Sequence, residues 1–213
     1  MAKIVLDFGS GNTCRNDWDY VKRMIDELKA VDTGKHEVIT KWQLFKKAGD
    51  NIPLEPKIFE AAYIYAQQLG YKTTSSVFDK ESLDFLLQFD VPFIKLANRR
   101  DLDWLAGEIP RKTMIYKSYG SPEELGCLMH QNEYRLLCVS EYPTTMKRYE
   151  EVFPKLEYYL GNYQYGLSDH TTDFTLWHRY RPDVVEWHYG LPDSTGLDAG
   201  PFMRTPEQLR EVL

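Results

Sequence analysis

The sequence has 213 residues, which is enough for one substantial hydrophobic core and short for two domains. Apolar residues make up 43% and charged residues 27%, the proportions of an ordinary globular protein. The formal net charge of −6, with no stripe of Lys and Arg, argues against a nucleic-acid-binding surface.

The N-terminal segment runs directly into a strand-like stretch and lacks the charged and apolar regions of a secretory signal. No apolar run approaches the roughly 20 residues needed to cross a bilayer. Cys14, Cys127 and Cys138 are odd in number and lack CxxC spacing, which fits a reducing compartment. We therefore expect a single cytoplasmic domain, residues 1–213, without nucleic-acid or membrane partners.

Short runs rich in β-branched and aromatic residues recur along the chain and predict eight strands. They cover residues 3–9, 37–43, 72–78, 92–98, 112–118, 135–140, 163–169 and 183–189. Helical spacing of apolar residues predicts intervening helices at 19–28, 54–69 and 80–89, the last with Asp79 as its N-cap. Because strands that alternate with helices pair in parallel, this order predicts a compact (β/α)8 TIM barrel of the α/β class.

An open doubly wound sheet is the alternative. It would require a glycine-rich phosphate loop after the first strand. The loop GSGNTC at 9–14 lacks the third glycine of that motif, and no acidic residue closes a matching second strand. The barrel is therefore the preferred architecture.

Polar side chains end the predicted strands, where the loops of such a barrel build the catalytic face. In chain order they are Asp7; Lys41 and Gln43; Ser75 and Ser76; Lys95 and Asn98; Lys117 and Ser118; Ser140, Glu141 and Tyr142; Ser168, Asp169 and His170; Glu186 and His188. A purely structural core would place Val, Ile and Leu at these positions. The strand ends therefore predict a polar site.

Lys41 and Lys95 occupy matching places on the second and fourth strands. Either lysine alone could extend to solvent from a strand end. Two together need an anionic partner, because burying unpaired ammonium groups is costly. A phosphate or carboxylate on a substrate fits, and the hydroxyls of Ser76, Ser140 and Ser168 could complete its hydrogen bonds.

His170 and His188 follow consecutive strands, so their imidazoles are expected to lie close together. A pair of imidazoles with open coordination positions suits Mn, Fe or Zn, and such an ion can polarise a carbonyl. Alone, His170 would be read as a hydrogen-bonded loop residue. Glu186 shares a strand face with His188 and is expected to point at the same cavity.

These residues resemble the N-acetylneuraminate (sialic acid) synthase family, with its pseudaminic and legionaminic acid relatives. The most specific likeness is GLSDHT at 166–171 followed by VVEWHYG at 184–190. TKWQ at 40–43, SSVFDKESLDFL at 75–86, VPFIKLAN at 91–98 and LLCVSEYPT at 136–144 are also similar to family segments. The resemblance covers most of the chain.

The resemblance implies condensation of phosphoenolpyruvate (PEP) with an N-acylated amino sugar or another aldose, giving a nonulosonic acid and phosphate. It implies that Lys41, Lys95, Ser76 and Ser168 hold PEP. It also implies that His170 and His188 carry Mn²⁺, with Mg²⁺ or Co²⁺ as alternatives. The remaining implied substrate contacts are Asp7, Gln43, Ser140, Tyr142, Asp169, Glu186 and Asp198, with Asp7 and Glu186 grouped with the lysines as catalytic.

The sequence also departs from the family pattern. Asp7 stands where the family has a longer glutamate. After Lys95 the family's acidic residue is missing unless Asp101 replaces it, because the chain reads Leu96-Ala97-Asn98-Arg99-Arg100. The family's C-terminal antifreeze-like domain has no counterpart in these 213 residues. The sugar side of the site is therefore expected to be altered.

Three functions remain open. The first is a metal-dependent, PEP-using synthase, and the second is a barrel that binds sugar or phosphate without turnover. The third is a two-histidine metal isomerase or epimerase, against which the two lysines argue. A homo-oligomer is allowed by the sequence but not indicated.

Overall fold

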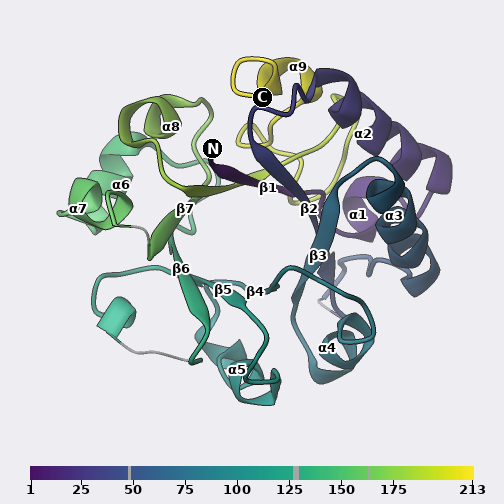
Figure 1. Ribbon diagram of the computed structural model, residues 1–213, viewed down its shortest axis with the longest axis horizontal. Helices are drawn as coiled ribbons and strands as arrows, with labels where there is room; N and C mark the ends of the chain where they lie inside the picture. Colours follow the sequence, from purple (N-terminus) through teal and green to yellow (C-terminus); the bar gives the residue numbers. More distant parts are fainter. Residues whose placement is uncertain (48, 127–129, 163) are drawn as a thin grey trace.

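The barrel predicted from the strand–helix alternation is present in the computed structural model, which describes residues 1–47, 49–126, 130–162 and 164–213. Eight parallel strands close in sequence order, with β8 paired to β1 (Figure 1). The strands are β1 Lys3–Asp7, β2 Glu37–Leu44, β3 Lys72–Val77, β4 Ile94–Leu96, β5 Ile115–Tyr119, β6 Glu133–Cys138, β7 Tyr165–Asp169 and β8 Val184–His188. The predicted fold class is confirmed.

Strand lengths differ most from the prediction at β4, which has three residues where seven were expected. Pro92 cannot donate to a ladder hydrogen bond, which is consistent with the late start of this strand. β4 pairs with β3 through Ser76 and Lys95. Below this pair, the Thr74 hydroxyl donates to the Phe93 carbonyl and links the two segments. The predicted seventh strand included Tyr163, which lies outside the described residues.

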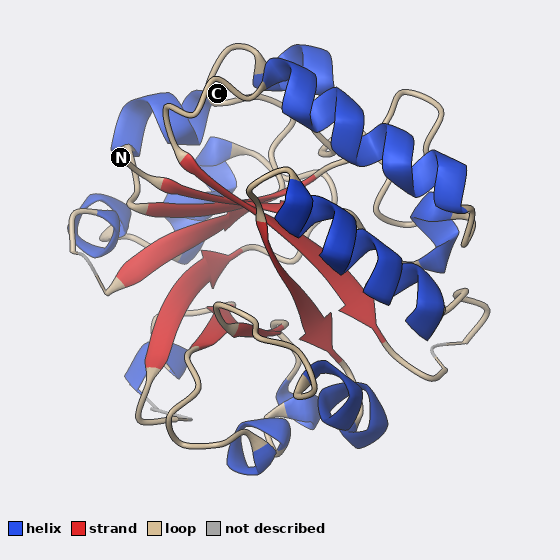
Figure 2. Cartoon of the chain, turned by 45° about the vertical axis from the view of Figure 1, so that its right-hand side comes forward, coloured by secondary structure: helices blue, strands red, loops and turns tan. Residues whose placement is uncertain are grey.

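Two long helices cover one side of the barrel and short ones cover the rest (Figure 2). The long helices are α2 Trp18–Val31 and α3 Pro56–Gln68. The short ones are α1 Gly11–Cys14, α4 Lys80–Leu86, α5 Leu105–Glu108, α6 Met146–Val152, α7 Leu156–Leu160, α8 Thr175–Tyr180 and α9 Pro206–Leu209, with 3₁₀ turns η1 Arg100–Leu102 and η2 Glu124–Gly126. Asp79 caps α4 as predicted, accepting from the Ser82 amide at 2.7 Å. No described helix is long and apolar enough to cross a membrane.

Two apolar layers stabilise the barrel. The larger one lies between the strands and the surrounding helices, and includes Trp42 and Trp187. The smaller one fills the barrel interior near the amino ends of the strands, and we call it the floor. Its residues are Val5, Ile39, Phe93, Tyr116, Leu136 and Val184. The Phe93 and Tyr116 rings stack with centroids 3.8 Å apart.

The free thiols of Cys14 and Cys138 are both buried. Cys127 lies outside the described residues. Burial raises the pKa of Cys14 to about 11, so this thiol stays protonated and unreactive at neutral pH.

Candidate active site

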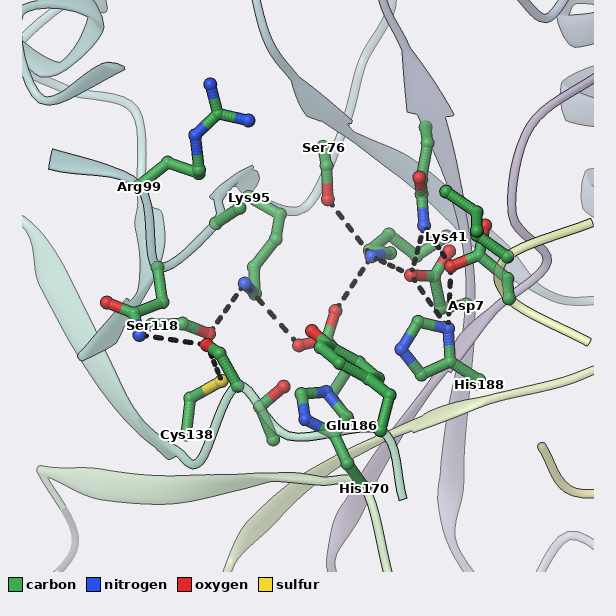
Figure 3. A pocket seen from close by; sticks show the side chains of 18 of the residues that line it. Asp7, Lys41, Ser76, Lys95, Arg99, Ser118, Cys138, His170, Glu186 and His188 are labelled. Carbon is green, nitrogen blue, oxygen red and sulfur yellow. Dashed lines mark hydrogen bonds and ion pairs between the residues drawn. The ribbon is translucent and has the colours of Figure 1, made fainter. Parts of the chain in front are cut away.

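Side chains alternate between the two faces of a strand, so the residue two positions beyond each floor residue also points into the barrel. Toward the carboxyl ends of the same strands this next layer is polar. It comprises Asp7, Lys41, Lys95, Ser118, Cys138 and Glu186. These residues line a cavity of about 440 Å³ at the barrel mouth (Figure 3).

Nearly all the residues predicted for the site line this cavity. They are Asp7, Lys41, Gln43, Ser76, Lys95, Ser140, Tyr142, Ser168, His170, Glu186, His188 and Asp198. Strand register accounts for much of this grouping, because Asp7 is level with both Lys41 and His188. The structure therefore brings together residues from six of the strands and from the loops after β6, β7 and β8.

Asp169 is the exception, and its assignment as a substrate contact is corrected. It lies between Ser168 and His170, so alternation turns its side chain out of the barrel. There its fully buried carboxylate accepts from Trp187 Nε1 at 2.9 Å and from the Thr171 amide at 2.8 Å. Arg204, also fully buried, lies 3.7 Å from it. Asp169 thus holds the segment after β7 in place.

Glu186 lies between the two lysines at the centre of the cavity. Its carboxylate is 2.9 Å from the Lys41 ammonium and 3.5 Å from the Lys95 ammonium. Lys41 also lies 2.6 Å from Asp7 and donates to the Ser76 hydroxyl at 3.0 Å. All four charged groups are nearly inaccessible to solvent.

The two lysines differ in how well they are paired. Burial alone would lower the pKa of Lys41, but the charges of Asp7 and Glu186 outweigh it, and the pKa is raised. For Lys95 burial prevails over the attraction of Glu186, and the pKa is lowered. The pKa of Glu186, which burial would raise, is lowered by the two lysines. The positive charge of Lys95 is therefore the less completely balanced of the two, and Lys95 is the lysine better able to bind an added anion.

One end of the cavity is acidic. The Gln43 side-chain amide donates to Asp7 at 2.9 Å and to Asp198 at 3.1 Å. Asp198 lies in the loop after β8, with its carboxylate 3.2 Å from Nδ1 of His188. Burial alone would lower the pKa of His188, but Asp198 and Asp7 outweigh it and raise the pKa. Carboxylates and an amide grouped in this way can accept from and donate to the hydroxyls of a polyol.

The opposite end presents cations and neutral donors. The Lys95 ammonium donates to the Ser118 hydroxyl at 2.8 Å, and the Asn98 amide donates to the Ser140 hydroxyl at 3.0 Å. A Cβ built on Gly120 would come within 2.5 Å of the Asn98 amide nitrogen, so this glycine allows Asn98 its place. The arrangement suits a bound anion.

Four polar or charged lining residues at this end were given no role from the sequence: Asn98, Arg99, Ser118 and Cys138. Asn98 and Ser118 were named among the polar strand ends, and Cys138 could have been found, because it lies two positions beyond the inward-facing Leu136. Asp101, considered as a replacement for the missing acidic residue, pairs with Arg99 at 2.6 Å and is not among the lining residues. Asp101 therefore does not replace that acidic residue in the cavity.

The rings of His170 and His188 lie close enough to share one metal ion. Nδ1 of His170 lies 2.8 Å from the Val139 carbonyl, which can only accept, so this nitrogen carries the hydrogen and Nε2 keeps its lone pair. Nδ1 of His188 faces Asp198, which leaves its Nε2 free. A metal–nitrogen bond of about 2.1 Å and a ligand angle of about 90–110° put ring centroids roughly 4.6–5.3 Å apart. The observed separation is 5.3 Å, so the residues fit a divalent ion.

A different donor set involves the same histidine. Ligand atoms of Asp7, His188 and Asp198 all lie within 4.8 Å of one another. However, the Asp7 oxygen that faces this group already contacts the Lys41 ammonium at 2.6 Å and the Gln43 amide at 2.9 Å. A cation there would be repelled by Lys41. We therefore favour the His170–His188 set, with Asp198 orienting His188.

Sequence searches find no matching family model and no matching curated protein. Comparison with solved structures finds relatives of the fold. One is N-acetylneuraminic acid (sialic acid) synthetase from Leptospira borgpetersenii serovar Hardjo-bovis, in complex with citrate. It has a TM-score of 0.75 and 20% identity, over 98% of this chain and 80% of that one.

A putative spore coat polysaccharide biosynthesis protein E from Chromobacterium violaceum has a TM-score of 0.81 and 19% identity, over 99% of this chain and 72% of that one. A truncated 3-deoxy-D-arabino-heptulosonate 7-phosphate synthase from Thermotoga maritima has a TM-score of 0.64 and 9% identity, over 99% of this chain and 83% of that one. At these identities the likeness shows a common barrel fold.

Proposed function

We propose that the cavity binds PEP and condenses it with an aldose, giving a 2-keto-3-deoxy sugar acid and phosphate. By resemblance, the acceptor class is the N-acylated amino sugars. Two structural neighbours, named as synthases of sialic acid and of 3-deoxy-D-arabino-heptulosonate 7-phosphate, support this kind of reaction, since both names denote 2-keto-3-deoxy sugar acids.

The observation that carries the proposal is the state of Lys95. Its ammonium is buried, its pKa is lowered, and its nearest carboxylate is 3.5 Å away and shared with Lys41. A buried cation so incompletely paired is costly unless a ligand supplies the missing charge. PEP supplies a carboxylate and a phosphate in one small molecule.

The charges of the cavity orient the two substrates. PEP lies with its phosphate toward Lys95, Ser118 and Asn98, because this end offers a cation and neutral donors. The aldose lies toward the acidic end, where Asp198 and Gln43 bind its hydroxyl groups. This order directs C3 of PEP toward the carbonyl carbon of the aldose.

The reaction forms a carbon–carbon bond and a bond from C2 to the oxygen of water, and it breaks the C2–O bond to phosphate. C3 of PEP attacks the aldehyde carbon, and water adds at C2 to supply the new keto oxygen. One proton of this water goes to the aldehyde oxygen and the other leaves with phosphate. Glu186, held ionised between the lysines, stabilises the positive charge that develops at C2.

Tyr142, about half exposed at the rim, covers the imidazole of His170 with ring centroids 4.1 Å apart.

His170 and His188 would hold a divalent ion, with Mn²⁺ the ion implied by the resemblance. When bound, such an ion supplies Lewis-acid polarisation of the aldose carbonyl. The Val139 carbonyl and Asp198 fix the two rings through their Nδ1 atoms. Because a ligating imidazole must be unprotonated, binding of the ion releases the proton that Asp198 favours on His188.

A second candidate is a barrel that binds a sugar or a phosphate ligand without turnover. The observation that favours it is the missing acidic residue after Lys95, for which Asp101 does not substitute in the cavity. Both candidates require an anionic ligand at the lysines. They differ in whether phosphate is released.

The binding test is thermal stabilisation by millimolar PEP, with Mn²⁺ present, of wild type, Lys41→Ala and Lys95→Ala. A charge-assisted hydrogen bond is worth roughly 1.5–3 kcal/mol, so each variant should bind PEP about tenfold to a hundredfold more weakly. Absence of any shift in the wild type would contradict the synthase and leave only a binder of another ligand.

Lys117 provides the matched control. It is also a nearly inaccessible lysine at the end of a strand, but it faces outward and pairs with Asp103 at 2.7 Å. Lys117→Ala should lose stability yet keep the PEP-induced shift measured against its own baseline. Loss of the shift in this variant as well would mean that the response reflects general destabilisation.

A further inference from the structure

Arg99 is the third cation that lines the cavity, and the sequence did not assign it a role. It lies in the loop between β4 and η1, four residues after Lys95. Its Nε and Nη2 donate to the two oxygens of Asp101 at 2.8 and 2.6 Å. Figure 3 shows its guanidinium turned away from the Lys95 ammonium.

The cavity has a shortage of positive charge for the ligand proposed above. A phosphate group carries roughly −1.5 to −2 charges at pH 7, and the carboxylate of PEP adds one more. Lys41 is already balanced by Asp7 and Glu186, at 2.6 and 2.9 Å. Lys95, with its share of Glu186, cannot neutralise a phosphate alone. A further cation is needed at the Lys95 end.

Arg99 is placed to supply that cation. It lines the same end of the cavity as Asn98, whose amide is fixed by Ser140 at 3.0 Å. The planar fork of a guanidinium binds two oxygens of a phosphate at once, which a lysine cannot do. A side chain in this position can therefore bind the phosphate from the open side while Lys95 binds it from below.

The contact that now holds Arg99 is easily exchanged. Both side chains of the Arg99–Asp101 pair are more than half exposed, and solvent screens such pairs so that they add little to stability. The neighbouring Arg100 instead binds Glu124, which also accepts from the Gly120 amide at 2.9 Å. Arg100 thus pairs with another segment, while Arg99 pairs within its own loop.

We propose that Arg99 exchanges the carboxylate of Asp101 for the phosphate of PEP, and so determines the preference of the site for a phosphorylated ligand. This inference rests on the proposed function. It concerns a residue of this chain that has no counterpart among the family motifs described above. It predicts opposite effects for substitutions at Arg99 and Asp101, because Asp101 competes with the ligand for Arg99.

The experiment measures affinities for PEP, pyruvate and inorganic phosphate by calorimetry in wild type and four variants. Arg99→Ala should weaken PEP and phosphate about tenfold or more and leave pyruvate unchanged. Arg99→Lys should recover part of the loss, since it restores the charge but not the fork. Asp101→Asn should tighten PEP severalfold by releasing Arg99.

Arg100→Ala is the matched control. It removes the same charge one residue further along the chain, and the Arg100 side chain is not among the residues that line the cavity. It should change PEP affinity less than threefold. The inference is overturned if Arg99→Ala binds PEP like wild type, if pyruvate weakens as much as PEP, or if Arg100→Ala matches Arg99→Ala. Failure of the wild type to bind PEP at all would overturn the proposed function and this inference together.

Discussion

The floor and the mouth of the barrel are built by the same strands, yet the floor is apolar and the mouth is charged. At the floor, Val5, Ile39 and Val184 pack with aromatic rings as in any core. Two residues further along the same strands stand Asp7, Lys41 and Glu186, equally inaccessible to solvent and all charged. Apolar side chains would fill the mouth at lower cost, so the charges there indicate selection for chemistry.

The largest effect should follow from breaking the charge pairing at the mouth. Lys41→Met leaves Asp7 and Glu186 buried without their closest cation, and should lower the free energy of unfolding by about 4 kcal/mol. Urea denaturation measures this loss. Adding Glu186→Gln to the variant should restore part of it, and a loss below about 1 kcal/mol would mean that the mouth charges are solvated.

A cavity in the floor should cost nearly as much and affect function far less. Phe93→Ala removes a ring stacked on Tyr116, and should lower the free energy of unfolding by about 3 kcal/mol. Its PEP-induced thermal shift, measured against its own baseline, should equal that of wild type. A PEP-induced shift that is lost in Phe93→Ala would show that packing at the floor is required for ligand binding at the mouth.

The two histidines of the mouth should respond to pH in opposite directions when metal is removed by a chelator. Burial and the charge on His188 lower the pKa of His170 to about 3. The unfolded chain then takes up this proton first, so stability falls as pH drops from about 6.5 toward 3, by up to roughly 1.4 kcal/mol per unit. The pKa of His188 is raised, so its contribution is present below pH 6.5 and is lost as pH rises through the folded value.

Urea denaturation between pH 4 and 7 checks these signs in single variants. In His170→Asn the free energy of unfolding should fall less steeply as the pH is lowered. In His188→Asn the stabilisation that charged His188 provides below pH 6.5 should be lost. The account is wrong if His170→Asn and wild type lose stability in parallel.

Lys95→Met should have the smallest effect on stability and a large effect on function. Because burial lowers the pKa of Lys95, an apolar replacement should leave the free energy of unfolding unchanged or raise it by about 1 kcal/mol. PEP binding should weaken strongly. If Lys95→Met destabilises as much as Lys41→Met, the two lysines are equivalent and Lys95 has no spare capacity for a ligand.

Sequence reasoning reached the barrel because eight strand-like runs alternate with helical ones, and that order admits few topologies. It failed at Asp169, where listing residues at strand ends ignored the alternation that turns this side chain outward. The same alternation, applied from Leu136, would have found Cys138, and applied from Tyr116 it would have selected Ser118 over Lys117.

Other features depend on distances that no local pattern encodes. Lys41 and Lys95 look alike in sequence and differ because Asp7 lies 2.6 Å from Lys41 and Glu186 lies closer to Lys41, at 2.9 Å, than to Lys95, at 3.5 Å. Arg99 lines the cavity because of the course of the loop after β4. The early end of that short strand and the contact of Asn98 with Ser140 define this course. Long-range contacts of this kind follow from the closed barrel and not from the segments themselves.

The most direct test of the synthase proposal follows phosphate release from PEP, with Mn²⁺ present, across a panel of aldoses and N-acylated amino sugars. The account predicts that at least one acceptor releases phosphate together with a product whose mass equals PEP plus aldose plus water minus phosphoric acid, and that Lys95→Met abolishes both signals. Binding of PEP without phosphate release for any acceptor would contradict catalysis and leave a binding protein on a synthase fold.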